Sequence, residues 1–550
     1  MRARAIGVAI VGALAALALS VPGILSTHRA ELLLADAAAL SASEAHEAYD
    51  IVERYRLPAF DQLAGASTEK LAASQVIAKA AKVGITSNYP SDPTATMQAL
   101  AQDVESRRGL AQAWHKEVDF TGATAHELQQ LVNDSPDTLI RLTSDLVLEA
   151  PVTMTSDTHI NGNGARVWCE LGGAAFVVDG VKEVSLANLD IRGNGDIGVF
   201  VHDASDVIVQ SCHIHDLRSK AVVVSGTSTY FHILDNEFRK NQQGGIEIAG
   251  AASYGELRGN KVVHNTGYSN WMAGVVLTNV EVPSVGELWA SFPGDVPHFA
   301  ERTTLADVPA SVHDVYLQGN TIGHNQSSGL YCDGVYRCFV DGNTIASNDK
   351  EGMCLDYGAL GCFVHANQIT DNGKRARQSE QALELDGMLG FGFTDDGSSC
   401  AKLPGISLDN AAYNVIESNT VQHNWGGGVK SVRTSMRNVI AGNLIDDNNR
   451  GQNDTFFFIG VELGNADEGA ESDSMDYMAD YQNLVVGNTI TGGHYTGVFI
   501  AHGCEGNVIT RNIIKGHTHF AFMCGSDLEN DLSANDYDGR FIDRSVIPFL

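Results

Sequence analysis

The stretch Gly329–Asp409 repeats a five-residue pattern, Gly-Leu-Tyr-Cys-Asp at 329–333 and Gly-Met-Cys-Leu-Asp at 352–356. Two further copies read Ala-Leu-Glu-Leu-Asp at 382–386 and Gly-Ile-Ser-Leu-Asp at 405–409. The four starts are 23, 30 and 23 residues apart. In each copy the side chains alternate between two faces, as in a strand that lies with one face on a core. A strand that returns at such a period predicts a β-solenoid.

The last residue of each copy is an aspartate that the alternation points away from the core. Because equivalent strands of a solenoid stack about 4.8 Å apart, we expect these carboxylates to form a column on one exposed face. Four stacked anions repel one another, so they require bound cations, raised pKa values or neighbouring Lys and Arg side chains. The predicted column, which is the main lead to function, consists of Asp333, Asp356, Asp386 and Asp409.

The composition restricts the possible partners. The 550 residues include 36 Lys and Arg against 67 Asp and Glu, for a formal charge of −31. Nucleic-acid binding depends on basic neutralisation of phosphates, so this balance argues against nucleic acid as a partner. The 56 glycines and 12 prolines fit a fold in which tight turns repeat between strands.

The N-terminus has the pattern of an export signal. Two arginines precede the apolar run Ala5–Leu19, which ends on small residues around Ser20. This predicts a secretory signal peptide over residues 1–20, and hence a periplasmic or extracellular protein. Apolar character continues to Leu25, so an uncleaved anchor is the alternative and would be the contact with a membrane.

The rest of the chain divides into three regions. Residues 28–118 are rich in Ala, Leu and Glu and are predicted to be helical, as a small bundle, a spacer or a packing partner for the solenoid. Leu128 and Val132 then predict a helix that caps the solenoid, since an open end exposes unpaired strand edges. We expect the solenoid to span residues 125–530 in about twelve coils, followed by a tail or cap over 531–550.

A second phrase of the form Gly-Asn-x-Ile recurs from residue 235 onward. Asn tolerates left-handed turn geometry, and its amide can hydrogen-bond to an identical residue stacked above it. We therefore predict a structural column of asparagines that includes Asn320, Asn343, Asn367, Asn419 and Asn443. A second asparagine that often follows the strand is interpreted as the next turn: Asn241, Asn265, Asn325, Asn348, Asn372, Asn424 and Asn448.

These phrases resemble the right-handed parallel β-helix superfamily over roughly residues 125–530. That superfamily includes pectate lyases, polygalacturonases, alginate lyases and mannuronan epimerases, and also non-enzymatic periplasmic repeat proteins. The resemblance implies an all-β parallel solenoid. The Asn-x-Ile phrase belongs to the coil itself, so the activity has to be inferred from other residues.

Three insertions interrupt the period, at Val280–His313, Gly373–Gln381 and Asn465–Gln482. Loops of this size on a solenoid usually build one wall of a groove. Two of them leave the coil on the side where the aspartate column ends its strand, so we expect them to flank it.

Ionisable outward side chains are concentrated in the coils between residues 331 and 433. Lys430 and Arg433 lie one coil beyond Asp409. A mixture of acids, bases and aromatic residues is the usual composition of a carbohydrate cleft. The predicted substrate-binding residues are Tyr331, Glu384, Ser407 and Glu462.

Three chemistries fit this face. In a lyase or C5-epimerase, the four aspartates of the column hold Ca²⁺ that neutralises a uronate, and Lys430, Arg433 or Tyr357 moves the C5 proton beside Asp356. In a glycoside hydrolase, two carboxyl groups act as acid and base or nucleophile, about 5 Å apart on neighbouring coils or about 9 Å apart on alternate coils. In a non-catalytic glycan-binding protein, the column only coordinates ions or sugar hydroxyls.

Two segments favour the first chemistry by resemblance. Gly352–Tyr357 resembles the Gly-x-x-x-Asp-Tyr coil of mannuronan epimerases, and Tyr331–Asp333 lies one coil earlier, although the Asp-Pro-His of their signature is absent. Val429–Ser431 is similar to the catalytic lysine coil of alginate and chondroitin lyases, with Glu462 where those enzymes have an arginine. The resemblance implies a polysaccharide substrate and a lyase or epimerase activity.

Histidines and cysteines give weaker signals. His213-x-His215 and His517-x-His519 have strand spacing that suits metal ligation, but the sequence shows no third ligand. The nine cysteines leave at least one unpaired. Cys338 and Cys362 occupy equivalent positions on adjacent coils, where either a disulfide or two stacked thiols would fit.

Overall fold

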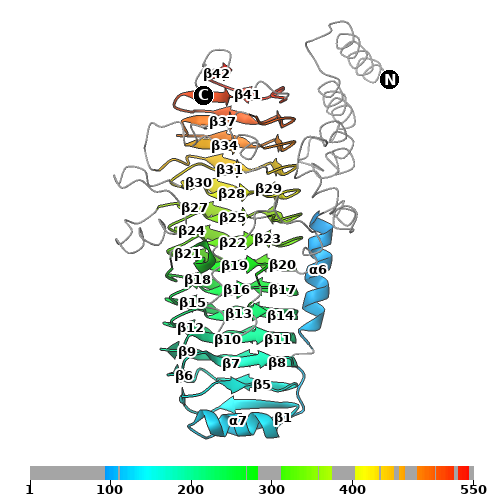
Figure 1. The fold of residues 1–550 in the computed structure, drawn as a ribbon, viewed down its shortest axis with the longest axis vertical. Coiled ribbons are helices and arrows are strands. Elements are labelled where there is room, and N and C mark those ends of the chain that lie inside the picture. Colours follow the sequence, from blue (N-terminus) through cyan, green and yellow to red (C-terminus); the bar gives the residue numbers. More distant parts are fainter. Residues whose placement is uncertain are drawn as a thin grey trace.

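The computed structural model describes residues 93–109, 112–267, 269–280, 282, 311–356, 358–374, 403–432, 435–450, 458–464, 480–501, 503–525 and 530–543. These residues wind into a β-solenoid whose three parallel sheets each contain 14 strands (Figure 1). The predicted all-β solenoid is confirmed, but the expected twelve coils are too few. The first coils precede residue 235 and lack the Gly-Asn-x-Ile phrase from which coils were recognised.

Each coil from β2 to β40 contributes one strand to each sheet, and β1, β41 and β42 add the terminal strands of sheets A, B and C. Sheet A consists of β1 (Lys116–Phe120), β2 (Thr138–Leu142), β5 (Thr158–Asn161), β8 (Lys182–Ala187), β11 (Ser205–Gln210), β14 (Thr229–Leu234), β17 (Ser253–Arg258), β20 (His313–Gln318), β23 (Phe339–Asp341), β26 (Phe363–His365), β29 (Val415–Glu417), β32 (Val439–Ala441), β35 (Leu484–Val486) and β38 (Val508–Thr510). Sheet B consists of β3 (Leu146–Leu148), β6 (Arg166–Cys169), β9 (Asp190–Gly193), β12 (His213–His215), β15 (Glu237–Arg239), β18 (Lys261–Val263), β21 (Thr321–Gly323), β24 (Thr344–Ala346), β27 (Gln368–Thr370), β30 (Thr420–Gln422), β33 (Leu444–Asp446), β36 (Thr489–Thr491), β39 (Ile513–Lys515) and β41 (Asp536–Tyr537). Sheet C consists of β4 (Val152–Thr153), β7 (Ala174–Asp179), β10 (Ile197–His202), β13 (Val222–Ser225), β16 (Ile246–Ile248), β19 (Val275–Thr278), β22 (Leu330–Asp333), β25 (Met353–Asp356), β28 (Ile406–Asp409), β31 (Val429–Val432), β34 (Ile459–Leu463), β37 (Thr496–Ile500), β40 (Phe520–Cys524) and β42 (Arg540–Asp543).

The interior of the solenoid is one continuous apolar core of Val, Ile, Leu and a few aromatic residues. The alternation within each strand decides which side chains enter it. In β22, Leu330 and Cys332 are fully buried in this core, whereas Tyr331 belongs to a separate cluster outside sheet C. The predicted inward and outward phases of this strand are therefore confirmed.

The asparagine column forms a hydrogen-bonded ladder along the solenoid. The side-chain amide of Asn320 donates to Oδ1 of Asn343 (2.9 Å), and that of Asn343 donates to Oδ1 of Asn367 (3.0 Å). Asn419 and Asn443 continue the ladder, so the predicted structural column is confirmed. The second predicted set forms its own ladder, of which Asn325 to Asn348 (2.9 Å) is one step.

A third ladder, from Asn414 to Asn530, was not predicted from the sequence. Asn414 donates to Asn438 (3.0 Å), and the series continues through Asn483 and Asn507 to Asn530. The asparagines of the three ladders satisfy turn backbone groups that would otherwise be buried without partners. They make the coils rigid and leave the outward side chains free to vary.

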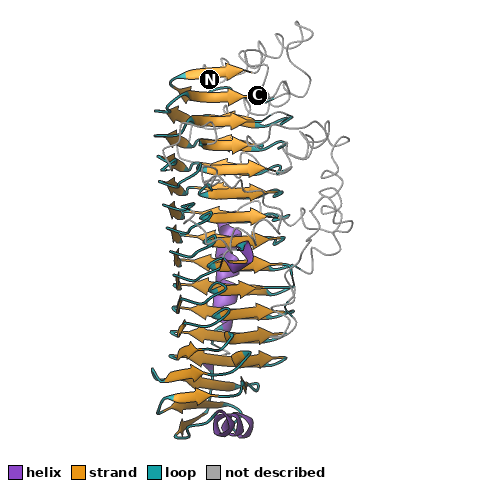
Figure 2. Cartoon of the chain, turned by 60° about the vertical axis from the view of Figure 1, so that its left-hand side comes forward, coloured by secondary structure: helices purple, strands orange, loops and turns teal. Residues whose placement is uncertain are grey.

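Helix α7 (Ala125–Asp134) lies across the N-terminal end of the solenoid, as Figures 1 and 2 show. A capping box starts it, because the Glu127 amide donates to Thr124 Oγ1 (3.2 Å) and the Thr124 amide donates to Glu127 Oε2 (3.1 Å). Leu128 and Val132 are fully buried against the first coil. The predicted capping helix is confirmed.

Helix α6 (Pro93–Arg107) runs along the outer face of sheet A (Figure 1). Met97, Leu100 and Val104 pack in a cluster with aromatic and aliphatic residues of that sheet. Two arginines at its end extend the contact, Arg107 to Asp206 of β11 (2.9 Å) and Arg108 to Glu256 of β17. The helix is therefore a packing partner of the solenoid, as expected for part of this region, and no helix in the described residues is long and apolar enough to cross a membrane.

Strands extend the solenoid beyond both expected limits. Strand β1 begins within the region 28–118 that was predicted to be helical, and it pairs with β2 in sheet A. Strands β41 and β42 lie within the predicted tail 531–550 and pair with β39 and β40. Both ends lack the repeated phrases, which is why the sequence placed them outside the solenoid.

Candidate functional site

The outward face of sheet C carries two columns of side chains in register. The first column runs through Val223, Glu247, Val276, Tyr331, Cys354, Ser407, Lys430, Glu462 and Phe499. In the second column, Thr278 is in register with Asp333, and Asp333 with Asp356. Leu355 and Leu408 are register partners on adjacent coils, and each is followed directly by an aspartate, Asp356 and Asp409. Before β22 the first column is aliphatic except for Glu247, which pairs with Lys220 at 3.1 Å, whereas from β22 to β34 it is mostly polar, and this second segment is the candidate site.

The candidate site is buried, which corrects the expectation of an exposed acidic face. Asp333 is 0% exposed, Asp356 5% and Glu462 4%. Helix η3 (Asn270–Met272) supplies part of the cover, since Trp271 meets Tyr331 edge to face with ring centroids 5.7 Å apart. The direction of the side chains followed from the alternation, but their cover comes from chain distant in sequence.

Tyr331 and Asp356 form the best-defined polar contact of the site. The Tyr331 hydroxyl donates to Oδ2 of Asp356 at 2.8 Å. Burial raises the pKa of Tyr331 well above its usual value, and the negative charges of Asp356 and Asp333 raise it further. The phenol therefore stays protonated and acts as a hydrogen-bond donor that orients the carboxylate.

Asp333 lies between two strands that hold it from either side. Its Oδ2 accepts a hydrogen bond from the Thr278 hydroxyl on β19 (3.3 Å). On the other side it is the register partner of Asp356, so the two carboxylate-bearing residues stand on adjacent coils. Asp333 and Asp356 are therefore two adjacent members of the predicted aspartate column.

Lys430 and Glu462 form an ion pair across β31 and β34, with Nζ and Oε1 3.5 Å apart. The Lys430 side chain is 23% exposed and that of Glu462 5%. Ser407 is the register partner of Lys430 on the preceding coil. Lys430 is thus a cation on the polar segment that still reaches solvent.

Four predicted site residues, Tyr357, Glu384, Asp386 and Arg433, lie outside the described residues. The sheet order nevertheless corrects the four-member column. Strand β25 pairs directly with β28, so the column contains no strand between Asp356 and Asp409. The column is therefore Asp333, Asp356 and Asp409. Most of the predicted insertion Gly373–Gln381 lies outside the described residues, and the next described strand, β28, begins at Ile406.

The comparisons with known proteins can now be set beside this geometry. The sequence profile described as "Right handed beta helix region" matches residues 149–279 and 310–537. The chain belongs to this family. A comparison with curated protein sequences finds no match.

Several solved structures align with this chain at low sequence identity. The A-module of mannuronan C-5 epimerase AlgE6 from Azotobacter vinelandii is 14% identical, with a TM-score of 0.42, and the match covers 76% of this chain and 95% of that one. The periplasmic alginate epimerase AlgG is 13% identical, with 76% and 84% covered and a TM-score of 0.35. The catalytic unit of a GH87 α-1,3-glucanase from Streptomyces thermodiastaticus strain HF3-3 is 11% identical, with 78% and 68% covered and a TM-score of 0.43.

One titratable residue of this right-handed β-helix protein was missed from the sequence. Asp480 is fully buried, and its carboxylate accepts hydrogen bonds from the backbone amides of Ser435 (3.0 Å) and Gly464 (3.2 Å). Burial raises its pKa to about 8, and the charge of Asp409 contributes to the shift. Asp480 therefore joins two coils across an insertion while remaining protonated at neutral pH.

A sequence signal for Asp480 exists. It stands eight residues before the ladder residue Asn488, the place that Ser435 takes before Asn443 and Cys504 takes before Asn512. That place is a core position in the neighbouring coils, so an aspartate there stands out once the coils are aligned on the ladder.

The cysteines are thiols in the described part of the chain. Burial raises the pKa of Cys338 well above its usual value, and a hydrogen bond with Cys362 adds to the shift. Of the two alternatives for this pair, the stacked thiols are therefore found and the disulfide is not.

The donor set at the aspartate column is compatible with a hard cation, because it consists of carboxylate oxygens with a threonine hydroxyl beside them. Among the described residues, however, these aspartates do not form a group of three donors within 4.8 Å of one another. A Ca²⁺ ion here would be held mainly by Asp333 and Asp356, and its remaining ligands would have to come from elsewhere.

Proposed function

We propose that this protein acts on a uronic-acid-containing polysaccharide, as a lyase or C5-epimerase, at the outward face of sheet C between β22 and β34. The observation that carries the proposal is the polar segment of this face, where the Tyr331 hydroxyl bonds Asp356 of the adjacent column one coil away and Lys430 is in register and ion-paired with Glu462. From β22 to β34 this segment extends over four coil rises, about 19 Å, which is long enough to meet more than one sugar unit.

Both reactions remove the proton at C5, next to a carboxylate whose negative charge opposes that removal. The partly exposed ammonium of Lys430 is placed to neutralise the substrate carboxylate, and Glu462 holds it in position. Asp356 is oriented by the Tyr331 hydroxyl, so its free rotation is restricted before substrate arrives. Tyr357 and Arg433 complete the proposal as candidates for the group that moves the proton.

Calcium is part of this proposal through Asp333, Asp356 and Asp409. Bound there, the ion would supply positive charge beside the substrate carboxylate. It would also offset the burial of these carboxylates, in addition to the contacts that Thr278, Tyr331 and Lys430 make on this face.

A glycoside hydrolase is a second candidate, favoured by the register of Asp333 with Asp356. One coil rise of about 4.8 Å is close to the separation of about 5 Å between the carboxyl groups of retaining enzymes. Asp333 and Asp409 are two coil rises apart, close to the separation in inverting enzymes.

The test is an activity screen of the purified chain against alginate, pectate, chondroitin and neutral glucans. A lyase creates an unsaturated product with ultraviolet absorbance, and an epimerase exchanges the C5 proton with deuterated water. A hydrolase releases reducing ends without either signal. Binding without any of these signals would leave a non-catalytic glycan-binding protein.

Asp356→Asn is the deciding variant, and we expect it to abolish the activity that the screen finds. Asp341→Asn is its matched control. Asp341 is a partly buried carboxylate on sheet A that bonds His365 at 2.8 Å, away from the candidate site. Equal losses in the two variants would mean that the activity does not reside on sheet C.

A further inference from the structure

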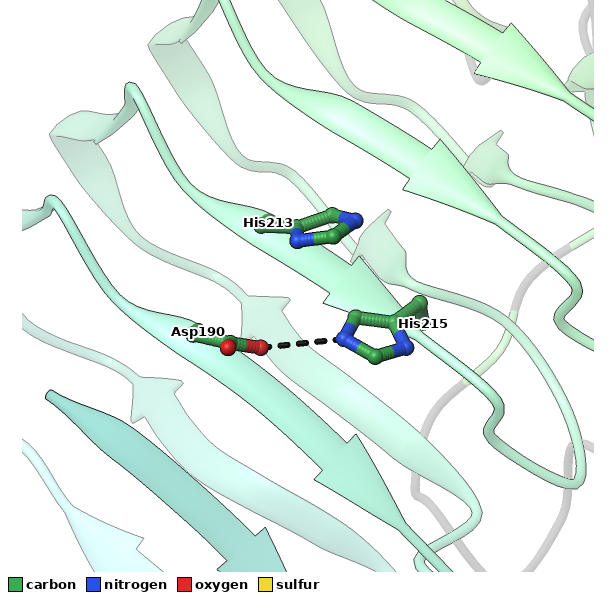
Figure 3. Close-up of side chains that lie close together, drawn as sticks. All are labelled: Asp190, His213 and His215. Atoms are coloured by element: carbon green, nitrogen blue, oxygen red, sulfur yellow. Dashed lines mark hydrogen bonds and ion pairs between the residues drawn. The ribbon is translucent and has the colours of Figure 1, made fainter. Parts of the chain in front are cut away.

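The His213-x-His215 pair gains a third potential ligand from the preceding coil. Strand β12 pairs with β9, so that His213 is in register with Asp190 on sheet B. Potential ligand atoms of Asp190, His213 and His215 all lie within 4.8 Å of one another (Figure 3). In the described residues no other group of three His, Cys, Asp or Glu side chains meets this criterion.

His215 is held in an orientation that suits metal binding. Its Nδ1 is 2.5 Å from Oδ2 of Asp216, and its Nε2 is 3.0 Å from Oδ1 of Asp190. The residue is 3% exposed, so its ring is fixed by packing as well as by these contacts. A carboxylate on one ring nitrogen is the arrangement that fixes the tautomer of metal-ligating histidines and presents the other nitrogen to the ion.

We propose that Asp190, His213 and His215 form a binding site for a divalent transition-metal ion of the zinc class. Two imidazoles and one carboxylate are a donor set that zinc accepts while keeping a fourth position open. Ligand atoms about 2.0–2.2 Å from a tetrahedral zinc stand roughly 3.3 Å apart. The separation of 3.0 Å between Asp190 Oδ1 and His215 Nε2 needs only a small adjustment to reach that value.

The site opens on the surface of the molecule. A cavity of about 410 Å³ is lined by Asn161, Asn163, Asn188, Asp190 and His213, among others. It gives the ion a path of entry and gives water or a small ligand access to the open position. Because it lies on sheet B, this site is distinct from the candidate site on sheet C.

Two guanidinium groups border the site and bear on its affinity. Arg239 Nε donates to His213 Nε2 at 2.8 Å, and Arg192 Nη2 is 3.7 Å from Asp190 Oδ2. A zinc ion that binds the His213 ring has to break the hydrogen bond from Arg239, and the loss of this bond opposes binding. Removal of this arginine should therefore strengthen binding rather than weaken it.

The second His-x-His pair shows that the spacing alone is not sufficient. The His517 ring lies 5.4 Å from that of His494, while His519 stacks on Tyr495 with centroids 4.0 Å apart. No described carboxylate joins them within ligand distance. What distinguishes β12 is the aspartate at the register position one coil earlier.

The test is a calorimetric titration of the full chain, freed of metal by a chelator, with zinc chloride. We expect one zinc ion bound per chain at this site, at least about 100-fold more weakly in Asp190→Asn and His215→Gln. Asp216→Asn should weaken binding about 10- to 100-fold, as loss of a residue that orients a ligand does. Arg239→Met should bind more tightly than the native chain. Cobalt in place of zinc should give the visible absorption of tetrahedral coordination, a readout that does not depend on stability.

His264→Gln is the matched control, because His264 stacks on His324 at 4.9 Å immediately after β18 of the same sheet. Its zinc affinity should equal that of the native chain. The proposal is overturned if the native chain binds no zinc, if Asp190→Asn and His215→Gln both bind within about twofold of it, or if His264→Gln removes the binding. If His215→Gln does not fold, Asp190→Asn decides, since the Asp190 side chain is 25% exposed and tolerates replacement more readily.

Discussion

Two regions of the outer face of sheet C have the same backbone and opposite chemistry. In the N-terminal coils, Phe200 and Val223 are buried in an apolar cluster with Ala249 and Val282. In the middle coils, the same register positions hold Tyr331, Lys430 and Glu462 beside buried aspartates. Both regions are covered, so exposure to solvent does not explain the difference.

The comparison distinguishes residues that stabilise the fold from residues that stability alone does not require. Burial of apolar side chains favours folding by about 25 cal/mol per Å², whereas burial of a carboxylate opposes folding unless it is hydrogen-bonded or paired. The N-terminal coils fill most of these positions with apolar residues, and the buried Lys220–Glu247 ion pair is the exception there. The polar middle coils are therefore a local departure from the best solution for stability, and such departures are expected at functional sites.

The prediction with the largest expected effect tests whether the two regions depend equally on the asparagine ladder. Asn260→Ala in the N-terminal coils and Asn367→Ala in the middle coils each remove a ladder step and leave several buried polar groups without the partner that the side chain supplied. At about 1 kcal/mol per group, each should lower the free energy of unfolding by about 4 kcal/mol. Urea denaturation monitored by circular dichroism measures both. A much smaller loss in one region would show that the framework is not uniform.

Activity should respond in the middle coils only. Lys430→Ala should lower turnover on the glycan identified by the screen about 100-fold or more, with the fold unchanged, because it removes the cation that meets substrate charge. Lys261→Ala is the control, since Lys261 forms a similar ion pair with Glu237 on sheet B at 3.1 Å. Steady-state kinetics and a thermal melt check both. Full activity in Lys430→Ala would move the chemistry away from this coil.

The free energy of unfolding should depend on pH through the buried carboxyl group of Asp480. The pKa of Asp480 is about 8 in the folded chain and 3.8 as the ordinary value, so between these values folding takes up a proton. The stabilisation is complete below about pH 4 and is lost as the pH rises to about 8, at up to about 1.4 kcal/mol per pH unit. Asp480→Asn should give a flatter profile of unfolding free energy across this window. A slope equal to that of the native protein would exclude Asp480 as its source.

The smallest effect concerns the hydroxyl of Tyr331. Tyr331→Phe removes the donor that satisfies buried Asp356 and should lower the free energy of unfolding by about 1–2 kcal/mol. Tyr230→Phe removes a comparable but exposed contact with Asp103 on α6 (3.4 Å) and should cost less than about 0.5 kcal/mol. If the two variants lose the same amount, the Tyr331–Asp356 contact is no stronger than a surface one.

The sequence predicts the framework well because that framework repeats. Asn320, Asn343 and Asn367 recur at short intervals with the same neighbours, and alternation within each strand places Leu330 inside and Tyr331 outside. The error at Asp386 has the same origin. Residues 382–386 copy the strand pattern, and pattern alone does not show that β25 pairs with β28 instead.

The site is less predictable because it depends on contacts between distant parts of the chain. The burial of Asp333 and Asp356 depends on what covers sheet C, as Trp271 does for Tyr331. The contact of Asp190 with His215 depends on the register between coils 23 residues apart, and the Asn-x-Ile phrase that marks this register is weaker before Asn236. Alignment of every coil on its ladder position would have revealed both Asp190 and Asp480.

The position of α6 has a consequence for the order of events during synthesis. The contact of Arg108 with Glu256 can form only after Glu256 has been synthesised, 148 residues further along the chain. At about 5–20 residues per second, the helix leaves the ribosome about 7 to 30 s before that partner exists. We therefore expect the helix to dock on coils that have already formed. Interactions made after the transition state act on the unfolding rate, so α6 should govern how long the native solenoid lasts and not how quickly it forms.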